Sequence, residues 1–406
     1  MSVQGGSDRL IKLDKTIYLD NNATTLCPDY VLKSMFNFAN MGNPSSEYKQ
    51  AKMCKQMIEK FKHEIAEQCN LKDDFEIIIN SGASESNNHI IHSIVRSYMC
   101  NKKSIPHIIT SSVEHKATTE CLSDLVDQGI IEWTKIDAHY RTIEPMELIA
   151  HFRENTALVS IMAANNETGI INNLAPLHVA CAARGVPLHS DAVQYFGKLS
   201  FDGQHTDAFS ASFHKLHGPA GCGLLAIRKT LLEGYQMCPH ICGTQNNHQR
   251  GGTENVMGIA GAFSGFRLTI NHLKSKALQT AKLRYLIMTE LSKKFKAQFV
   301  EDVDISSPPQ LIWIMPKDLS KTIPNTILVS VVRDNVCNKA IREALELRNV
   351  IVGLGSACNT GSQSHVLEAL GFPAELARGV IRISLCHFNT EKQIKKFITI
   401  FTEVLA

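Results

Sequence analysis

Short apolar runs that end in polar, glycine-bearing segments recur between about residues 75 and 230. Most of them lack the strict alternation of a half-exposed strand, which is typical of strands covered by helices on both faces. Stretches with helical periodicity follow most of the runs. The expected strands are Glu76–Ile79, His107–Thr110, Ala157–Ala163, Val186–His189, Ala208–Ser210 and Gly223–Ile227. This alternation predicts an α/β fold with a largely parallel sheet, in which ligands gather at the carboxyl ends of the strands.

The pattern changes after Gly265. A long helix is expected there, because apolar residues recur at a spacing of four, and the final helix opens with a capping box. The residues concerned are Leu283, Ile287, Leu291 and Phe295 in the long helix, Thr390 and Gln393 in the capping box, and two strand-like runs, Thr326–Val332 and Val380–Leu385. We therefore expect a large domain over residues 17–265 and a smaller α+β domain over residues 266–406, with residues 1–16 packing on the smaller one.

Composition and charge narrow the class of protein. With 406 residues, 44% of them hydrophobic and 20% charged, the chain is a globular protein with room for two domains. The net charge of +3 gives no reason to expect nucleic acid or a membrane surface as the main partner. No apolar run approaches the roughly 20 residues of a membrane-spanning helix. The first residues lack the apolar core of a secretory signal, and they carry Asp8 and Asp14, unlike a transit peptide.

The 12 cysteines are scattered through a long chain rich in core residues. Reduced thiols in a cytoplasmic protein are therefore expected rather than a disulfide framework. Cys238, His240 and Cys242 form one short cluster, but no second pair stands at zinc-like spacing, so we expect no metal site.

A lysine follows directly on the expected strand that begins at Ala208. Ser212, His214 and Lys215 precede a Gly-Pro turn. A lysine in this place can form a Schiff base with an aldehyde cofactor, while the hydroxyl and the imidazole can hold an anion. An exposed loop lysine is the plain alternative.

Acidic and amide side chains follow two other expected strands. Asp191 can pair with a protonated pyridine nitrogen, and Gln194 can bond a ring oxygen. Asn166, in an amide-rich turn, can contact a ring oxygen or a substrate carboxylate. A helix N-cap at Asp191 and an ordinary turn at Asn166 explain the same residues.

Three further segments suit an anion or an aromatic ring. Ser84 lies at an expected helix start, where free N–H groups favour a phosphate. His115 follows a strand and can stack on a ring or carry protons. The loop Arg250–Asn255 is basic and rich in glycine, as anion-covering loops are. A plain turn, a structural histidine and a surface loop are the respective alternatives.

The segment Gly353–Gly361 places Cys358 among small residues, between two structured segments. A nucleophilic cysteine needs access and freedom to move, which this setting provides. Arg382 lies within an expected C-terminal strand, where a buried guanidinium requires an anionic partner such as a substrate carboxylate.

Taken together, these segments resemble the cysteine desulfurase and selenocysteine lyase family, a NifS-like branch of the class V aminotransferases with the fold-type I architecture of pyridoxal-phosphate enzymes. The likeness runs from Tyr18 to the final helix. Its landmarks are the segments Tyr18–Thr25, Gly42–Ser46, Ser81–Ser86, Val113–His115, Asn165–Gly169, His214–Lys215, Arg250–Asn255, Gly355–Cys358 and Ile381–Leu385.

The resemblance implies a role for each candidate residue. Lys215 is the cofactor lysine and the base for the α-proton, and Cys358 receives sulfur from L-cysteine as a persulfide. His115 stacks on the ring of pyridoxal 5'-phosphate. The other cofactor contacts implied are Ala83, Ser84, Ser212 and His214 on the phosphate, Asp191 on the ring nitrogen, Gln194 and Asn166 on the ring oxygen, and Thr253 on the phosphate of the neighbouring subunit. Asn166 and Arg382 fix the substrate carboxylate, and a homodimer with shared sites follows.

Other activities remain open at this point. Mammalian selenocysteine lyases share several of these segments, so release of selenide and alanine from L-selenocysteine is the main alternative. Another class V enzyme, such as an aminotransferase, would leave the Cys358 segment unexplained. A non-catalytic scaffold is a further alternative, against which the joint presence of Lys215, Asp191, His115 and Cys358 argues. The loop after Cys358 is shorter than in housekeeping desulfurases and their C-terminal tail is missing, so the sulfur acceptor is not implied.

Overall fold

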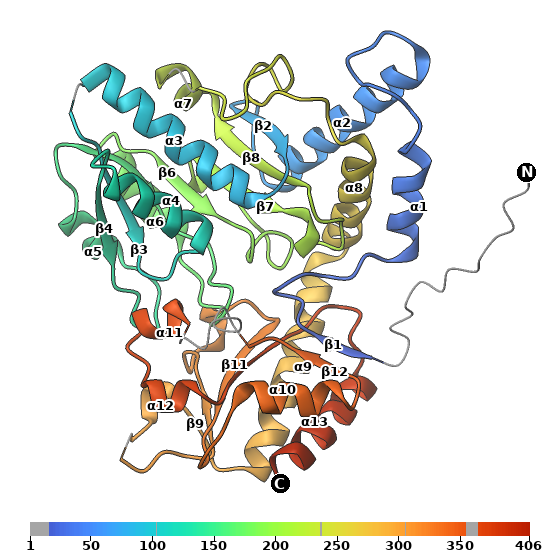
Figure 1. Cartoon of the computed structure of the whole chain (residues 1–406), viewed down its shortest axis with the longest axis vertical. Helices are drawn as coiled ribbons and strands as arrows, with labels where there is room; N and C mark the ends of the chain where they lie inside the picture. The colour runs from blue at the N-terminus through green and yellow to red at the C-terminus, as the bar shows by residue number, and fades with distance from the viewer. Residues whose placement is uncertain (1–15, 103, 236–237, 305, 355–363) are drawn as a thin grey trace, which may run out of the picture.

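The computed structural model describes residues 16–102, 104–235, 238–304, 306–354 and 364–406. Its strands form a seven-stranded sheet in the upper half of the molecule and a four-stranded sheet in the lower half, as drawn in Figure 1. Among the helices of these ranges, none is both long and apolar enough to cross a membrane. The expected packing of residues 1–16 falls outside the described residues, apart from Thr16.

The seven-stranded sheet is parallel except for one strand, β8, which runs antiparallel to both of its neighbours. All six strands expected between residues 75 and 230 are present, and the largely parallel sheet is confirmed. The edge strand β4 was missed because most of its residues are partly exposed, so it lacks an apolar run. In spatial order the strands are β2 (Phe75–Asn80), β8 (Gly223–Arg228), β7 (Ala208–Ser212), β6 (Leu188–Asp191), β5 (Thr156–Ser160), β3 (His107–Ser111) and β4 (Glu132–Ile136).

Helices cover both faces of this sheet. Successive residues of a strand point to opposite faces, so each strand contacts helices on both sides. Ile108 packs in a cluster with α3 and α4, whereas Ile109 packs in a cluster with α5 and α6. One face carries α3 (Ala83–Lys102), α4 (Lys116–Asp127) and α7 (Lys229–Gly234), and the other carries α2 (Lys49–Gln68), α5 (Pro145–Ala150), α6 (Leu174–Ala182) and α8 (Val256–Ile270). The short helix α1 (Asp29–Phe38) packs on α8.

The four-stranded sheet also lies between helices. The capping box predicted at Thr390 and Gln393 is confirmed at the start of α13. The strands of the four-stranded sheet are, in spatial order, β13 (Val380–Ser384), β11 (Thr326–Val331), β10 (Leu311–Trp313) and β9 (Ala297–Phe299). One face packs on α9 (Leu273–Lys294), α10 (Asn338–Glu346) and α13 (Glu391–Leu405), the other on α11 (His365–Ala369) and α12 (Ala374–Ala377).

The N-terminal segment joins the lower half of the molecule. Strand β1 (Ile17–Leu19) pairs in parallel with β12 (Val350–Val352), and Asp20 forms a bridge with Ser384. Figure 1 shows the chain crossing from β1 to the upper half at this point. The predicted division of the chain at residue 265 falls within α8 and stays a prediction.

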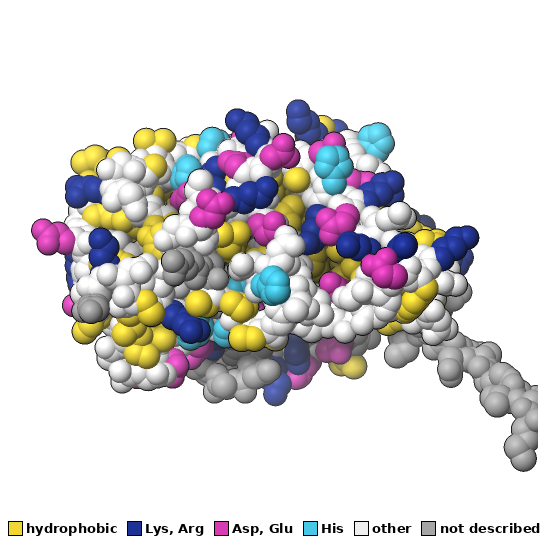
Figure 2. All heavy atoms as spheres, turned by 90° about the horizontal axis from the view of Figure 1, so that it is seen from above, with side chains coloured by type: hydrophobic (Ala, Val, Ile, Leu, Met, Phe, Trp, Pro, Cys, Tyr) yellow, Lys and Arg dark blue, Asp and Glu magenta, His cyan; other side chains and the backbone are white. Residues whose placement is uncertain are grey.

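The outer surface carries both signs of charge. On the face seen in Figure 2, basic and acidic side chains stand beside one another rather than in separate patches. This mixture matches the near balance of 42 basic and 39 acidic residues.

Candidate active site

A cavity of about 500 Å³ opens where the carboxyl ends of the parallel strands meet the start of α3, the segment after β1 and strand β13. We call it the Lys215 cavity. Ten of the twelve residues predicted for the site line it, from segments far apart in the sequence. They are Ala83, Ser84, His115, Asn166, Asp191, Gln194, Ser212, His214, Lys215 and Arg382. A cavity therefore lies at the strand ends, where the sequence predicted a ligand site.

Lys215 sits in a short 3-10 turn (η2, Phe213–Lys215) immediately after β7. Its Nζ donates to two backbone carbonyls, Asn22 O at 2.7 Å and Ala23 O at 2.5 Å. Burial and, to a smaller extent, the nearby Arg382 guanidinium lower its pKa to about 8. A lysine in this state loses its proton at close to neutral pH and can then act as a nucleophile or base.

Asp191 ends β6 and is buried. Its Oδ2 accepts a hydrogen bond from Asn87 Nδ2 at 2.8 Å, and its Oδ1 accepts one from the backbone N–H of Val193 at 3.0 Å. No helix begins at this residue, so the N-cap alternative is wrong. A buried carboxylate held in this way suits a cationic partner inside the cavity.

The two histidines of the cavity are held as neutral rings. His115 caps α4 by accepting from the Ala117 N–H, and its other edge is open to the cavity. Its pKa is lowered, chiefly because protein surrounds much of the ring, although Asp191 acts in the opposite direction. Burial lowers the pKa of His214 to about 4, and Lys215 adds to the effect. Both rings can therefore hydrogen-bond without carrying a positive charge.

The start of α3 offers free backbone donors to the cavity. Ala83 and Ser84 occupy its first turn, where N–H groups have no partner within the helix. Ser212 lies opposite, since a Cβ placed on Gly82 would come within 3.6 Å of its hydroxyl. This combination of a helix N-terminus, two hydroxyls and the His214 ring suits a phosphate.

Arg382 enters the cavity from β13 and is buried. It forms an ion pair with Asp20, Nη2 to Oδ1 at 2.8 Å, and donates to the backbone carbonyl of Asn166 at 3.2 Å. Its Nε has no hydrogen-bond partner among the described residues. Because an unpaired N–H on a buried guanidinium is costly, this residue suits a carboxylate ligand.

Several residues of the cavity were missed by sequence reasoning. Asn22 lines it and is almost fully buried, and Lys198 donates from behind to Gln194 and Asn22. Asn87 and Asp20 hold Asp191 and Arg382 in place. The landmark segment Tyr18–Thr25 contains Asp20 and Asn22, but its pattern does not reveal which side chains they contact.

Two predicted residues do not line the Lys215 cavity. Thr253 is exposed on the loop before α8. That loop is tied to the first turn of α3, because Arg250 Nε pairs with Glu85 Oε1 at 2.9 Å. Cys358 lies outside the described residues.

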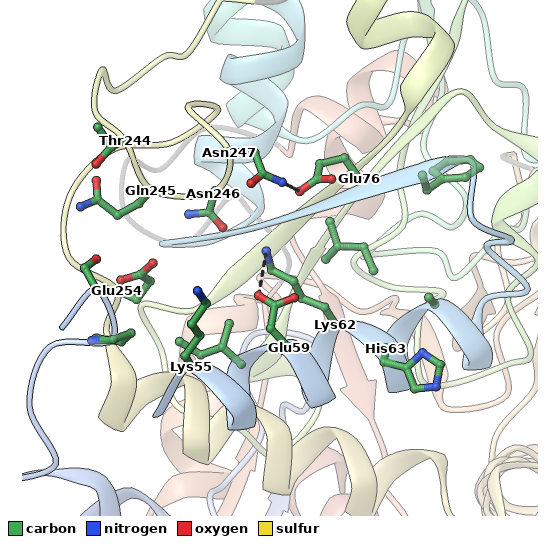
Figure 3. Close-up of a pocket in the computed structure, with 16 residues that line it drawn as sticks. Lys55, Glu59, Lys62, His63, Glu76, Thr244, Gln245, Asn246, Asn247 and Glu254 are labelled. Carbon is green, nitrogen blue, oxygen red and sulfur yellow. Dashed lines mark hydrogen bonds and ion pairs between the residues drawn. The ribbon is translucent and has the colours of Figure 1, made fainter. Parts of the chain in front are cut away.

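A second cavity, of about 610 Å³, lies between α2, β2 and the loop 244–247 (Figure 3). We call it the Lys55 cavity. Its side chains pair with one another, Lys62 with Glu59 at 4.0 Å and Asn247 Nδ2 with Glu76 Oε1 at 3.0 Å. None of the predicted site residues lines it. Metal-binding groups of three His, Cys, Asp or Glu side chains are not found in the part of the chain that is described, which includes Cys238, His240 and Cys242.

Comparison with known proteins agrees with this geometry. The model of the family "Aminotransferase class-V" matches residues 17–397. The chain is 33% identical to "Cysteine desulfurase IscS" of Dictyoglomus turgidum, over 97% of this chain and 95% of the relative. A solved "NIFS-LIKE PROTEIN" has a TM-score of 0.83 and 32% identity, covering 96% of this chain and 99% of the other. A structure titled "SspA in complex with cysteine" has a TM-score of 0.75 and 26% identity, covering 92% and 100%.

The predicted fold class and family resemblance are thus confirmed. The class-V match spans nearly the whole chain, and the relative of known name is aligned over almost its full length. The chain belongs to the cysteine desulfurase family of class-V aminotransferases, whose members depend on pyridoxal 5'-phosphate.

Proposed function

We propose that the protein converts L-cysteine to L-alanine and transfers the sulfur to the thiol of Cys358. One observation carries the proposal: a lysine with a pKa of about 8 and a buried arginine with an unpaired N–H line the same cavity. The lysine suits a base that takes the proton from the α-carbon of an amino acid, and the arginine suits a partner for the carboxylate of the same amino acid. The relative of similar fold whose title names cysteine supports an amino acid of this kind.

The residues of the Lys215 cavity fit pyridoxal 5'-phosphate. Ala83, Ser84, Ser212 and His214 would hold its phosphate at the start of α3, where N–H groups lack partners within the helix. Asp191 would pair with its ring nitrogen, Gln194 would meet its ring oxygen, and His115 would contact its ring. When bound, the cofactor withdraws electrons from the α-carbon of the substrate, which makes the β-sulfur a leaving group.

Lys215 would act as the acid–base group. Its amine is neutral in a substantial fraction of molecules near neutral pH, because burial and Arg382 lower its pKa to about 8. The neutral amine would accept the α-proton of the substrate. The backbone carbonyls of Asn22 and Ala23 would stabilise the ammonium group that results, and the same proton can then be returned to form alanine.

Arg382 and Asn166 would fix the substrate carboxylate. The ion pair with Asp20 and the bond to Asn166 O hold the guanidinium in one orientation at the wall of the cavity. Such an arrangement places the α-carbon with little loss of entropy on binding.

Cys358 would receive the sulfur. The substrate Cβ–S bond breaks, a bond forms between the substrate sulfur and the Cys358 sulfur, and the carbon skeleton leaves as alanine after protonation.

The same proposal includes a homodimer in which Thr253 reaches the neighbouring cofactor phosphate. Its support is that Thr253 is exposed, lies outside the cavity of its own chain and belongs to a loop fixed at the start of α3 by the Arg250–Glu85 pair. The described cysteines are free thiols, which supports the proposed cytoplasmic location. Two domains, 17–265 and 266–406, stay part of the proposal.

The test is alanine release by the purified holoenzyme from L-cysteine and, separately, from L-selenocysteine. We expect the native protein to use L-cysteine and Cys358→Ala to lose that activity. Activity of Cys358→Ala on L-selenocysteine alone would indicate a lyase. A native protein that stays colourless with added cofactor, or that releases no alanine from either substrate, contradicts the proposal.

A further inference from the structure

A second lysine, Lys198, lies in the turn that follows β6, behind two residues that line the Lys215 cavity, Asn22 and Gln194. Its Nζ lies between two side-chain oxygens, Asn22 Oδ1 at 2.7 Å and Gln194 Oε1. The aliphatic part of the side chain retains some exposure along a small pocket of about 50 Å³ behind Lys215. The amino group itself is enclosed by protein.

The local backbone brings this lysine inside. Gly197 has a φ of +75°, and a Cβ at this position would come within 2.3 Å of Leu216 Cδ2. Only glycine allows both the positive φ and the close approach to the residue that follows Lys215. The turn therefore directs Lys198 into the site rather than into solvent.

Lys198 fixes which end of the Gln194 carboxamide is the oxygen. A lysine ammonium has only donors, so the atom that it meets must be Oε1. The opposite atom, Nε2, donates to the backbone carbonyl of Asn22 at 2.9 Å, and a carbonyl can only accept. Both partners require the same orientation. One Nε2 hydrogen then remains for the cavity that Gln194 lines.

Asn22 links this arrangement to Lys215. Its carbonyl oxygen accepts from Gln194 Nε2 and from Lys215 Nζ, while its side-chain oxygen accepts from Lys198 and, at 3.1 Å, from Asn325. The charged or titratable groups that line the cavity with Gln194 are Glu85, His115, Asp191, His214, Lys215 and Arg382, and Lys198 and Asp20 bond to lining residues from outside it. Of these, Lys198 is the one bonded to the amide oxygen of Gln194.

We propose that Lys198 is a positioning residue that holds the Gln194 carboxamide so that it offers N–H, rather than C=O, to an oxyanion on the ring of the bound cofactor. The inference rests on the proposed function, since it takes Gln194 to meet the ring oxygen. An N–H donor stabilises an oxyanion, whereas a carbonyl in the same place favours the protonated oxygen. Lys198 thus acts on the cofactor through Gln194 and not by contact.

Burial lowers the pKa of Lys198 well below its ordinary value, and the charges of Lys215 and Arg382 add to this. A neutral amine is still a donor to Gln194 Oε1. A neutral amine can also accept, but the Asn22 carbonyl already takes Nε2 as its donor, so Lys198 meets Oε1 as a donor in either charge state.

The experiment records the visible absorption of the holoenzyme against pH, without substrate. Lys198→Met removes the donor and keeps most of the stem, so Gln194 is free to turn. We expect the pH midpoint of the colour change to move upward by about one unit, because the ring oxygen then holds its shared proton more tightly. Lys198→Arg keeps a donor and should leave the midpoint close to that of the native protein.

Lys276→Met is the matched control. Lys276 lines the same small pocket but bonds to the backbone carbonyl of Leu268 and not to Gln194. Its replacement should leave the midpoint unchanged. Equal midpoints for Lys198→Met and the native protein, or equal shifts for the two Met variants, would overturn the proposal.

A further variant covers the case in which Lys198→Met fails to fold. Gln194→Glu places a carboxylate oxygen toward the cavity whichever way the side chain turns, and it should also raise the midpoint. An unchanged midpoint would again overturn the inference. Because no turnover is measured, a shifted midpoint in a protein that releases no alanine would support this inference while contradicting the proposed activity.

Discussion

The Lys215 cavity and the Lys55 cavity are similar in volume, about 500 and 610 Å³, yet they differ in every property that matters for chemistry. In the first, buried groups from distant segments face one another, and burial shifts the pKa of Lys215 and His214. In the second, Lys55 and Glu59 are exposed, and several polar groups pair locally (Figure 3). Volume alone therefore does not distinguish the two cavities, whereas buried groups with shifted pKa values favour the Lys215 cavity as the active site.

The sharpest test of this contrast is Lys215→Ala. We expect alanine release to fall by about 10³-fold or more, because the variant loses the group that binds the cofactor and moves the α-proton. The measurement is steady-state alanine formation with saturating cofactor. Retention of a tenth of the native rate would show that the chemistry does not depend on this lysine.

The next largest effect is expected for Arg382→Lys. A lysine keeps the charge but loses the guanidinium fork, so KM for L-cysteine should rise about 10–100-fold with a smaller change in kcat. Arg267→Lys, which alters a partly exposed pair with Glu64, is the control and should change neither constant. A loss confined to kcat in Arg382→Lys would argue against a role in holding the substrate carboxylate.

The pH dependence of kcat tests the buried lysine directly. A base works in its unprotonated form, so kcat should rise with pH up to a pKa of about 8 for Lys215 and then level off. Below this pKa the rate should fall about tenfold for each pH unit. Titration of His115 should cause no change in kcat above pH 6.5, because the pKa of this histidine is lowered from that value, chiefly by burial. A flat profile through pH 8 would contradict the assignment.

A moderate effect is expected on the loop that borders the Lys55 cavity. If Thr253 reaches the phosphate in a partner subunit, Thr253→Ala should weaken cofactor binding about tenfold, the value of one hydrogen bond to a charged group. Thr244→Ala is a matched control, since Thr244 is exposed on the same loop and lines the Lys55 cavity. Cofactor titration by absorbance measures both. A sedimenting monomer with full activity would exclude the shared site.

The smallest effect is expected inside the Lys55 cavity itself. Lys55→Ala should change alanine release less than about twofold and the free energy of unfolding by no more than about 0.5 kcal/mol, because the side chain is exposed. Denaturant unfolding and the alanine assay measure the two quantities. A loss comparable to that of Arg382→Lys would make the Lys55 cavity a second functional site.

Residues that end strands were the ones that could be predicted from the sequence. Asp191, Ser212 and His115 follow apolar runs, and parallel strands bring their carboxyl ends to one edge of the sheet. The strands themselves were predicted for the same reason, apart from the partly exposed β4. The individual roles of these residues remain predictions.

Residues that act through a partner were not predictable in this way. Lys198 meets Asn22 across 176 positions, and Asp20 meets Arg382 across 362. In the sequence, Lys198 follows Gly197 in what reads as a turn, where a surface lysine is the common case. Its burial depends on the close approach of Gly197 to Leu216, which no local pattern reveals.

The contact between the segment after β1 and strand β13 has a consequence for how the enzyme is made. Asn21 and Asn22 leave the ribosome early, but Asn21 bonds to Ser384, which is 363 positions further on. At about 5–20 residues per second, synthesis needs about 20–70 s to reach that strand. Until then the bonds of Asn21 and Asn22 to Ser384, beside the carbonyls that receive Lys215, cannot form. We expect the nascent chain to acquire its cofactor only after its C-terminal strands have been translated.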